Sequence, residues 1–129
     1  MSTIRVDNFG PSAGGTTYSA RGIAKAWVNW TSHPTTVNDS LNVSSLTDNA
    51  TGDFDVNYTN DFNTANYSTS GNQAFNTNIS MYIYMVQPRN SGTVLVGSCG
   101  VYTKYTGDGG GSGIGDYYFN CLTAHGDLA

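Results

Sequence analysis

The feature that most constrains this chain is the alternation in residues 41–59, LNVSSLTDNATGDFDVNYT. In its second half, Phe54, Val56 and Tyr58 point to one side and polar residues to the other, a period of two that indicates a half-buried β-strand. Between the halves, residues 48–53 are rich in Asp, Asn and Gly, which favour turns. The stretch therefore predicts an antiparallel hairpin with a longer loop. Because an isolated hairpin is only marginally stable in water, the rest of the chain must supply partner strands.

The amino-acid composition indicates an all-β protein. Charged residues make up only 11% of the chain, and Glu is absent. Because Glu and Lys normally fill the exposed faces of helices, their scarcity argues against a helical protein. The polar surface must come instead from Asn, Thr and Ser, which suit strands and turns. A chain of 129 residues corresponds to one domain and is long enough to bury a core without a disulfide.

The charge balance argues against two classes of partner. The formal net charge is −4 and the isoelectric point is near 4.6, so no basic surface is expected that would neutralise nucleic-acid phosphates. No apolar run approaches the length of about 18 residues that a membrane-spanning helix needs. The first residues also lack the apolar segment of a signal peptide. We therefore expect neither a nucleic-acid partner nor a membrane partner.

Residues 1–22 differ in character from the rest of the chain. Ile4, Val6 and Phe9 are spaced to line one short extended segment, and the Gly-Pro-Ser-Ala-Gly-Gly run that follows interrupts regular structure. This pattern predicts an N-terminal anchoring arm with a flexible joint, followed by a β-domain in residues 23–129. The alternative is a frayed terminus. We favour the arm because frayed termini rarely carry Ile, Val and Phe at such spacing.

Residues 22–30, GIAKAWVNW, fit either a helix face or a strand. We choose the strand, with Ala26, Val28 and Trp30 on one side and Trp27 on the other. Two Trp residues this close imply a core contact, or an interface where one face is not covered by the domain itself.

Residues 79–86, ISMYIYMV, are apolar on both faces of an expected strand. Such a strand is covered on both sides, either inside a sandwich or at a contact between subunits. The candidate interface residues of the chain are therefore Trp27, Trp30, Tyr82 and Tyr84.

Shorter segments complete the expected set of strands. Residues 35–40 fit either a loop or a short edge strand, and residues 60–65 fit either a helical turn or an Asx-turn. The Ser-Gly-Asn triplet at 70–72 is expected to end a strand. Other strand-length pieces lie at residues 66–69, 93–98, 100–105 and 117–124. Strands at this spacing predict a single β-sandwich or jelly-roll-like domain.

Residues 107–116, GDGGGSGIGD, suggest a phosphate-binding loop, but the pattern fails in detail. They contain no G-x-G-x-x-G window and no Gly-Lys-Ser/Thr, and no βαβ pattern surrounds them. Asp108 and Asp116 flank the glycines, but a Ca²⁺ site needs about six or more oxygen ligands. We therefore expect a hairpin loop, with no metal site and no cofactor.

No catalytic constellation is evident in the sequence. His125 with Asp127 is the nearest match to a base and its orienting group, and Ser98 or Ser112 is the only nucleophile to set beside them. The chain contains no G-x-S-x-G motif. Without Glu, paired-carboxylate chemistry would need two Asp in contrasting environments, and the Asp residues here sit mostly in turns. We expect no catalytic residues and no enzymatic activity, with a hydrolase as a remote alternative.

Cys99 and Cys121 both fall in apolar strands. Two buried free thiols that act as small apolar side chains are the favoured interpretation. A disulfide stays open if the two strands are neighbours, because the sequence does not fix the pairing.

Three stretches carry a resemblance to a known family: AKAWVNW at 24–30, NVSSLTDNATGDFDVNYT at 42–59, and AHGDLA at 124–129. They resemble small virion proteins of tailed bacteriophages, many of them marine or cyanobacterial, which are described as tail-fibre-like or structural. The opening STIRVDNFGPSAGG also looks like the N-terminal segment of that family. The resemblance implies a β-rich structural protein that forms a homotrimer and has no catalytic residues.

From the residues and this resemblance together we expect a phage virion structural protein, assembled in the cytoplasm of the host bacterium. Its arm would dock on another virion protein, and its β-domain would act as a head decoration or cement protein or as part of a short tail fibre. The alternative is a carbohydrate-binding adhesin module that contacts host-surface glycans. In either case the candidate receptor loop carries Asp108, Ser112 and Asp116.

Overall fold

The computed structural model describes residues 8–9, 18–19, 23–74, 82–107 and 112–129. Of the predicted arm, it describes a short ladder in which β1 (Asn8–Phe9) pairs with β2 (Tyr18–Ser19). The backbone of Phe9 belongs to this ladder, and its side chain lies outside the described part. Ile4, Val6 and Asp108 lie outside the described residues altogether.

From residue 23 onward, the described strands form one continuous antiparallel sheet. In space they follow the order β4-β3-β11-β7-β8-β9-β6-β5, and β10 extends the sheet by pairing with β9. A short 3₁₀ helix, η2 (Ser91–Thr93), lies between β8 and β9. The strands are β3 (Ala26–Ser32), β4 (Thr35–Leu41), β5 (Val43–Ala50), β6 (Asp53–Tyr58), β7 (Ser68–Ala74), β8 (Tyr82–Pro88), β9 (Ser98–Gly107), β10 (Ser112–Ile114) and β11 (Phe119–His125).

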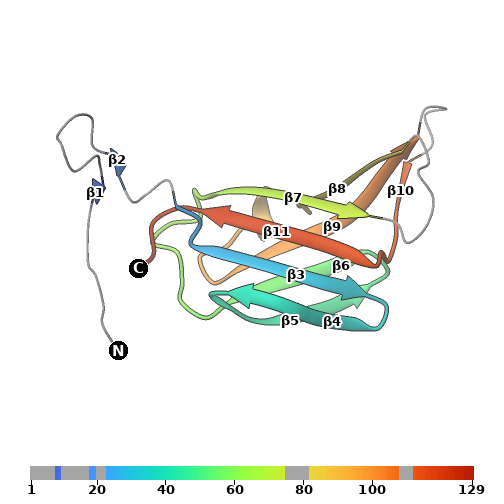
Figure 1. Ribbon diagram of the computed structural model, residues 1–129, viewed down its shortest axis with the longest axis horizontal. Helices are drawn as coiled ribbons and strands as arrows, with labels where there is room; N and C mark the ends of the chain where they lie inside the picture. The colour runs from blue at the N-terminus through green and yellow to red at the C-terminus, as the bar shows by residue number, and fades with distance from the viewer. Residues whose placement is uncertain (1–7, 10–17, 20–22, 75–81, 108–111) are drawn as a thin grey trace.

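The sheet rolls over on itself into a nearly closed, barrel-like layer. In Figure 1, β3, β11 and β7 lie in front and β6, β9 and β8 lie behind. The two edge strands, β4 and β5, meet along the open seam, where Thr35 Oγ1 donates a hydrogen bond of 2.6 Å to Asp48 Oδ2. The all-β prediction is thus confirmed. The finer prediction of a sandwich or jelly roll is not, because the strands belong to one rolled sheet.

Asn42 makes the corner at which the chain passes from β4 into β5. Its φ of 55° is left-handed, a conformation that Asn tolerates better than most residues. The side-chain amide of Asn42 fixes this corner through two hydrogen bonds to the backbone of Asn60. Its Oδ1 accepts from Asn60 N at 2.8 Å, and its Nδ2 donates to Asn60 O at 3.1 Å.

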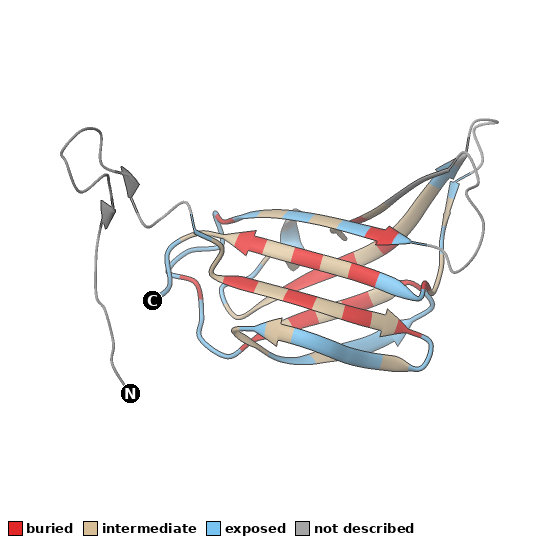
Figure 2. Cartoon of the chain, viewed as in Figure 1, coloured by how far each residue is buried: buried red, intermediate tan, exposed pale blue. Residues whose placement is uncertain are grey.

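The core fills the inside of the roll, and strand alternation places it there. Along β3, β6 and β11 every second residue is buried, which Figure 2 shows as alternating bands. Trp30 meets Phe54 edge to face at 5.9 Å between ring centroids, which joins the front and back layers. The buried apolar residues are Ala26, Val28, Trp30, Phe54, Val56, Tyr58, Phe62, Tyr67, Val86, Cys99, Val101, Tyr117, Leu122 and Ala124.

The predicted hairpin at 41–59 is confirmed, with a shorter turn than expected. β5 pairs with β6, and bulges in the ladder take up residues that the sequence placed in a loop. Only Thr51 and Gly52 make the turn, and Gly52 supplies the positive φ of 65° that it needs. The strand prediction for 23–30 is also confirmed, and residues 35–40 form the edge strand that was one of two alternatives.

Two local predictions are wrong. The triplet 70–72 lies inside β7 and does not end it, because Gly71 is needed there for close packing: a Cβ would meet Cys121 O at 2.6 Å and Val86 Cβ at 2.7 Å. Residues 93–97 form no strand, since the chain passes through η2 and an isolated bridge between Val94 and Cys99 before β9 begins. Strand propensity alone did not reveal this turn.

Residues 60–65 form no helix. Phe62 is buried, and its backbone forms an isolated bridge with Leu128 in the C-terminal segment. Within the described ranges, no helix has the length and apolar character that crossing a membrane would require.

Candidate functional site

At one end of the roll, which we call the arm end, β3 begins and β11 runs out into the C-terminal segment (Figure 1). The chain enters the described domain from the predicted arm at residue 23, just before β3. Phe62 ties the end together, because its N–H donates to Val96 O at 2.9 Å and its backbone bridges Leu128. Large apolar side chains are exposed around this point: Ile23, Leu41, Leu95, Val96 and Leu128.

An open hollow of about 390 Å³ lies beside two of these side chains, Leu41 and Leu128. Most of its exposed lining is apolar, and Lys25 is the one charged residue among those that line it. The lining residues are Ala24, Lys25, Leu41, Asn42, Thr59, Asn60 and Leu128. Exposed aliphatic groups around a hollow are typical of a surface that contacts another macromolecule.

A second open hollow, of about 360 Å³, lies on the other side of the C-terminal segment and is more polar. His125 and Asp127 line it together with Ser68, so the structure does bring the sequence-predicted pair to one place. Ser98 and Ser112, the nucleophiles considered with that pair, do not line this hollow. The arrangement therefore lacks the third member of a nucleophilic triad among the residues considered for it.

The opposite end, which we call the loop end, brings the candidate receptor loop beside the β5–β6 turn. Asp116 Oδ1 accepts a hydrogen bond of 2.8 Å from Gly52 N in the β5–β6 turn. Ser112 begins β10, and its side chain is exposed. Ile114, Tyr118 and Phe119 are also exposed near this end. The structure thus places Ser112 and Asp116 on the same loop cluster, while Asp108 lies outside the described residues.

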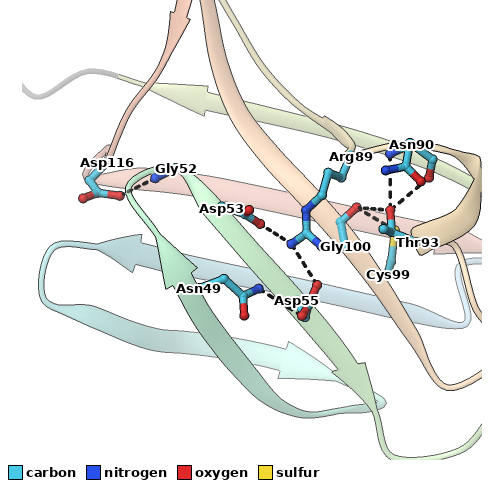
Figure 3. A network of polar contacts seen from close by, with 10 residues as sticks. All are labelled: Asn49, Gly52, Asp53, Asp55, Arg89, Asn90, Thr93, Cys99, Gly100 and Asp116. Carbon is cyan, nitrogen blue, oxygen red and sulfur yellow. Dashed lines mark hydrogen bonds and ion pairs between the residues drawn. The ribbon is translucent and has the colours of Figure 1, made fainter.

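The back face, which we define as the outward positions of β8, β9, β6 and β5, carries a charged network (Figure 3). Arg89 forms ion pairs with Asp53 and with Asp55, the latter at 3.0 Å between Nη2 and Oδ1. Asn49 Nδ2 then donates to Asp55 Oδ2 at 2.9 Å. Burial lowers the pKa of Arg89, but the hydrogen bond and charge of Asp53, with those of Asp55, outweigh it and raise that pKa above its ordinary value.

Local structure holds Arg89 in place. Its N–H donates to Gly100 O at 2.7 Å, which ties the end of β8 to β9. The next residue, Asn90, caps η2 by accepting from Gly92 N at 2.8 Å. Gly100 leaves room for the network, since a Cβ there would meet Asp55 Oδ1 at 2.9 Å and Arg89 Nη1 at 3.0 Å. The sequence signal for this network was weak: two Asp on the polar side of a strand and an Arg in a distant turn.

The front face, which we define as the outward positions of β4, β3, β11 and β7, carries Trp27. In the strand register Trp27 stands between Leu41 of β4 and Thr123 of β11. Trp30, by contrast, is fully buried in the core. The candidate interface must therefore be corrected: Trp27 is available to a partner, whereas Trp30 is enclosed by its own domain. Tyr82 and Tyr84 pair with β9 through their backbone, and their side chains lie outside the described part.

The titratable groups of the core are held in their neutral forms. Burial is the main cause that raises the pKa of Tyr58, of Tyr67 and of Cys99, the last to about 11. Tyr67 Oη lies 3.0 Å from the carbonyl oxygens of Leu95 and Ser98, to which it donates. Cys99 and Cys121 are both free, as favoured, and their strands are not neighbours. Cys99 is buried as expected, but Cys121 is only half-buried, because its side chain points out of the roll.

In the part of the chain that the structure describes, no group of three or more His, Cys, Asp or Glu side chains is placed to hold a metal ion. A scan against protein families, a search of curated proteins and a search of solved structures each gave no match for the chain. The functional argument therefore depends on the residues and their geometry.

Proposed function

We propose that the protein is a structural component of a tailed-bacteriophage particle. It attaches through residues 1–22 and the arm end, and its loop end and outer faces point away from the attachment site. The observation that carries this proposal is the arm end itself, where five large aliphatic side chains are exposed and two of them, Leu41 and Leu128, line a hollow close to where residues 1–22 join the domain. Burial of these groups against a second protein would be favourable by the hydrophobic effect.

The resemblance of residues 24–30 and 42–59 to small virion proteins supports the same proposal. The resemblance adds to the proposal that the protein is a homotrimer and that it has one of two positions in the particle: a decoration or cement protein of the head, or part of a short tail fibre. Sedimentation of the purified protein tests the proposed trimer, because a protein that is monomeric at all concentrations would refute it. Antibody labelling of intact particles, viewed by electron microscopy, separates label over the head from label on the tail.

The attachment surface is tested with a matched pair of variants in the encoding phage. Leu95→Asp places a charge among the aliphatic groups of the arm end, and Ile114→Asp places one at the loop end. The two side chains are similarly exposed, 52% and 45%, so both variants should fold. We expect Leu95→Asp, and deletion of residues 2–15, to reduce incorporation into particles strongly, while Ile114→Asp is incorporated normally. Normal incorporation of both the deletion and Leu95→Asp would refute the proposal.

The second candidate function is a glycan-binding module. The half-buried Trp27 on the outer front face favours it, because aromatic side chains with one open face are common contacts in ligand sites.

A further inference from the structure

The front face is nearly free of charge, and this sets it apart from the rest of the surface. The sequences of β3, β4, β7 and β11 contain no Lys or Arg, and Asp39 is their only carboxylate. His125, at the end of β11, is the only His in these four strands. The outward positions are filled mainly by Asn, Thr and Ser, so the face offers many hydrogen-bonding groups without a strong field of either sign.

Two aromatic side chains lie on this face at a fixed spacing. Trp27 is in register with Thr123, and Phe119 precedes Thr123 by four positions on the same strand, so both rings belong to one face. Four residues of β-strand span about 13 Å, and one strand step adds about 5 Å across the sheet, so the two side chains leave the sheet about 14 Å apart. Phe119 is 44% exposed.

Polar side chains beside the two rings are held in place by hydrogen bonds to one another. Asn38 lies at a bulge of β4, and its Nδ2 donates to Asn29 Oδ1 at 2.8 Å and to Thr31 Oγ1 at 3.4 Å. Asn29 is in register with Cys121, midway between Trp27 and Phe119. On the far side of β11, the exposed side chains of Ser70 and Asn72 continue the polar surface. Groups that are already ordered lose less conformational entropy when a ligand binds.

We infer that this face binds a neutral oligosaccharide, laid mainly along the strands from Trp27 toward Phe119. This deepens the second candidate function and does not depend on the first. Each ring can cover the apolar C–H side of a sugar, and the Asn, Thr and Ser side chains between them can exchange hydrogen bonds with its hydroxyl groups. Because the face lacks cations, it does not suit nucleic acid or an acidic polysaccharide.

The test is a titration of the full-length protein with a panel of neutral hexasaccharides built from glucose, mannose, galactose or N-acetylglucosamine. Isothermal titration calorimetry reports binding, because it also measures variants that lack Trp27, in which the only other Trp, Trp30, is buried and gives no optical signal for the face. We expect at least one member of the panel to bind, and oligogalacturonate, an acidic probe, not to bind. Trp27→Ala and Phe119→Ala should each weaken the affinity about tenfold or more, as truncation of an aromatic anchor does.

Matched variants on the back face serve as controls. Arg89→Gln and Tyr102→Ala change exposed or partly exposed groups of the same sheet and should leave the affinity for the hexasaccharide unchanged. Unfolding midpoints of all four variants show that each is folded at the temperature of the titration, and Trp27→Phe should retain part of the affinity. The inference is overturned if no hexasaccharide binds, or if binding survives Trp27→Ala.

A second copy of the chain is the rival occupant of this face. If Trp27→Ala converts an oligomer into a monomer in sedimentation, and no sugar binds, the face is an interface between copies and the glycan inference is wrong. Loss of glycan binding with normal incorporation of the protein into particles would separate this inference from the proposed attachment at the arm end.

Discussion

The front and back faces belong to one sheet, yet they use their polar residues differently. On the back face, Arg89 draws in Asp53 and Asp55, and Asn49 completes the contact with Asp55. The charges there satisfy each other and hold β5, β6 and β8 together. On the front face the four strand sequences contain no Lys or Arg and one carboxylate, Asp39, and uncharged Asn, Thr and Ser side chains lie around Trp27. A self-paired network serves the fold, whereas an ordered, uncharged surface with an open ring is suited to a partner.

The largest expected difference separates the two Trp residues of β3. Trp30→Ala empties the centre of the core and should lower the free energy of unfolding by about 3–5 kcal/mol. Trp27→Ala, three residues earlier on the outer face, should lower it by about 1 kcal/mol. Urea unfolding of both variants checks this. Equal losses would contradict the assignment of the two rings to opposite sides of the sheet.

The next effect concerns the neutral groups beneath the back layer. Burial raises the pKa of Cys99 from an ordinary value of 9.0 to about 11, so the unfolded chain loses this proton first. Stability is therefore fully present below about pH 9 and should fall by about 2 kcal/mol as the pH rises through about 11. The raised pKa values of Tyr58 and Tyr67 extend the loss to higher pH.

Unfolding measured by denaturant between pH 8 and pH 11 tests this dependence. Cys99→Ala should flatten the slope over that interval, even though it also lowers stability by removing buried atoms. An unchanged slope in Cys99→Ala would assign the alkaline loss to other groups. Cys121→Ala, on the front face, is the matched control and should keep the original slope.

A smaller effect is expected for the polar networks themselves. Arg89→Gln leaves the carboxylates of Asp53 and Asp55 close together without a cation, and should cost about 1–2 kcal/mol of stability. Asn38→Ala on the front face removes only neutral, exposed hydrogen bonds and should cost about 0.5 kcal/mol or less. The Arg89 effect should shrink in high salt, because salt screens the remaining repulsion, while the Asn38 effect should not change. Thermal unfolding at low and high salt distinguishes the two.

The smallest effect on energy is also the simplest to measure. Cys121 is half-buried with its side chain on the front face, whereas Cys99 is fully buried. A water-soluble thiol reagent should therefore label Cys121 in the native protein and Cys99 only as the protein unfolds. Mass spectrometry of labelled peptides identifies each site. Rapid native labelling of Cys99 would show that the back layer opens far more readily than its packing implies.

The sequence by itself determined which residues face the core. The period of two in 54–58 and 24–30 is a local property, set by the alternating direction of side chains along a strand. It correctly placed Phe54, Val56 and Tyr58 inside and put Trp27 and Trp30 on opposite sides. The scarcity of charge and the absence of Glu correctly indicated an all-β fold, because the exposed faces of helices are normally filled by Glu and Lys.

Only the tertiary structure decided which strands are neighbours, because register depends on contacts between residues far apart in the chain. The place of β11 between β3 and β7 brings Phe119 and Thr123 beside Trp27. The pairing of β9 with both β6 and β8 brings Arg89 to Asp53 and Asp55. No local sequence pattern predicts either of these two contacts. The two faces therefore differ in the side chains that meet on them through strand order, although the alternation that builds them is the same.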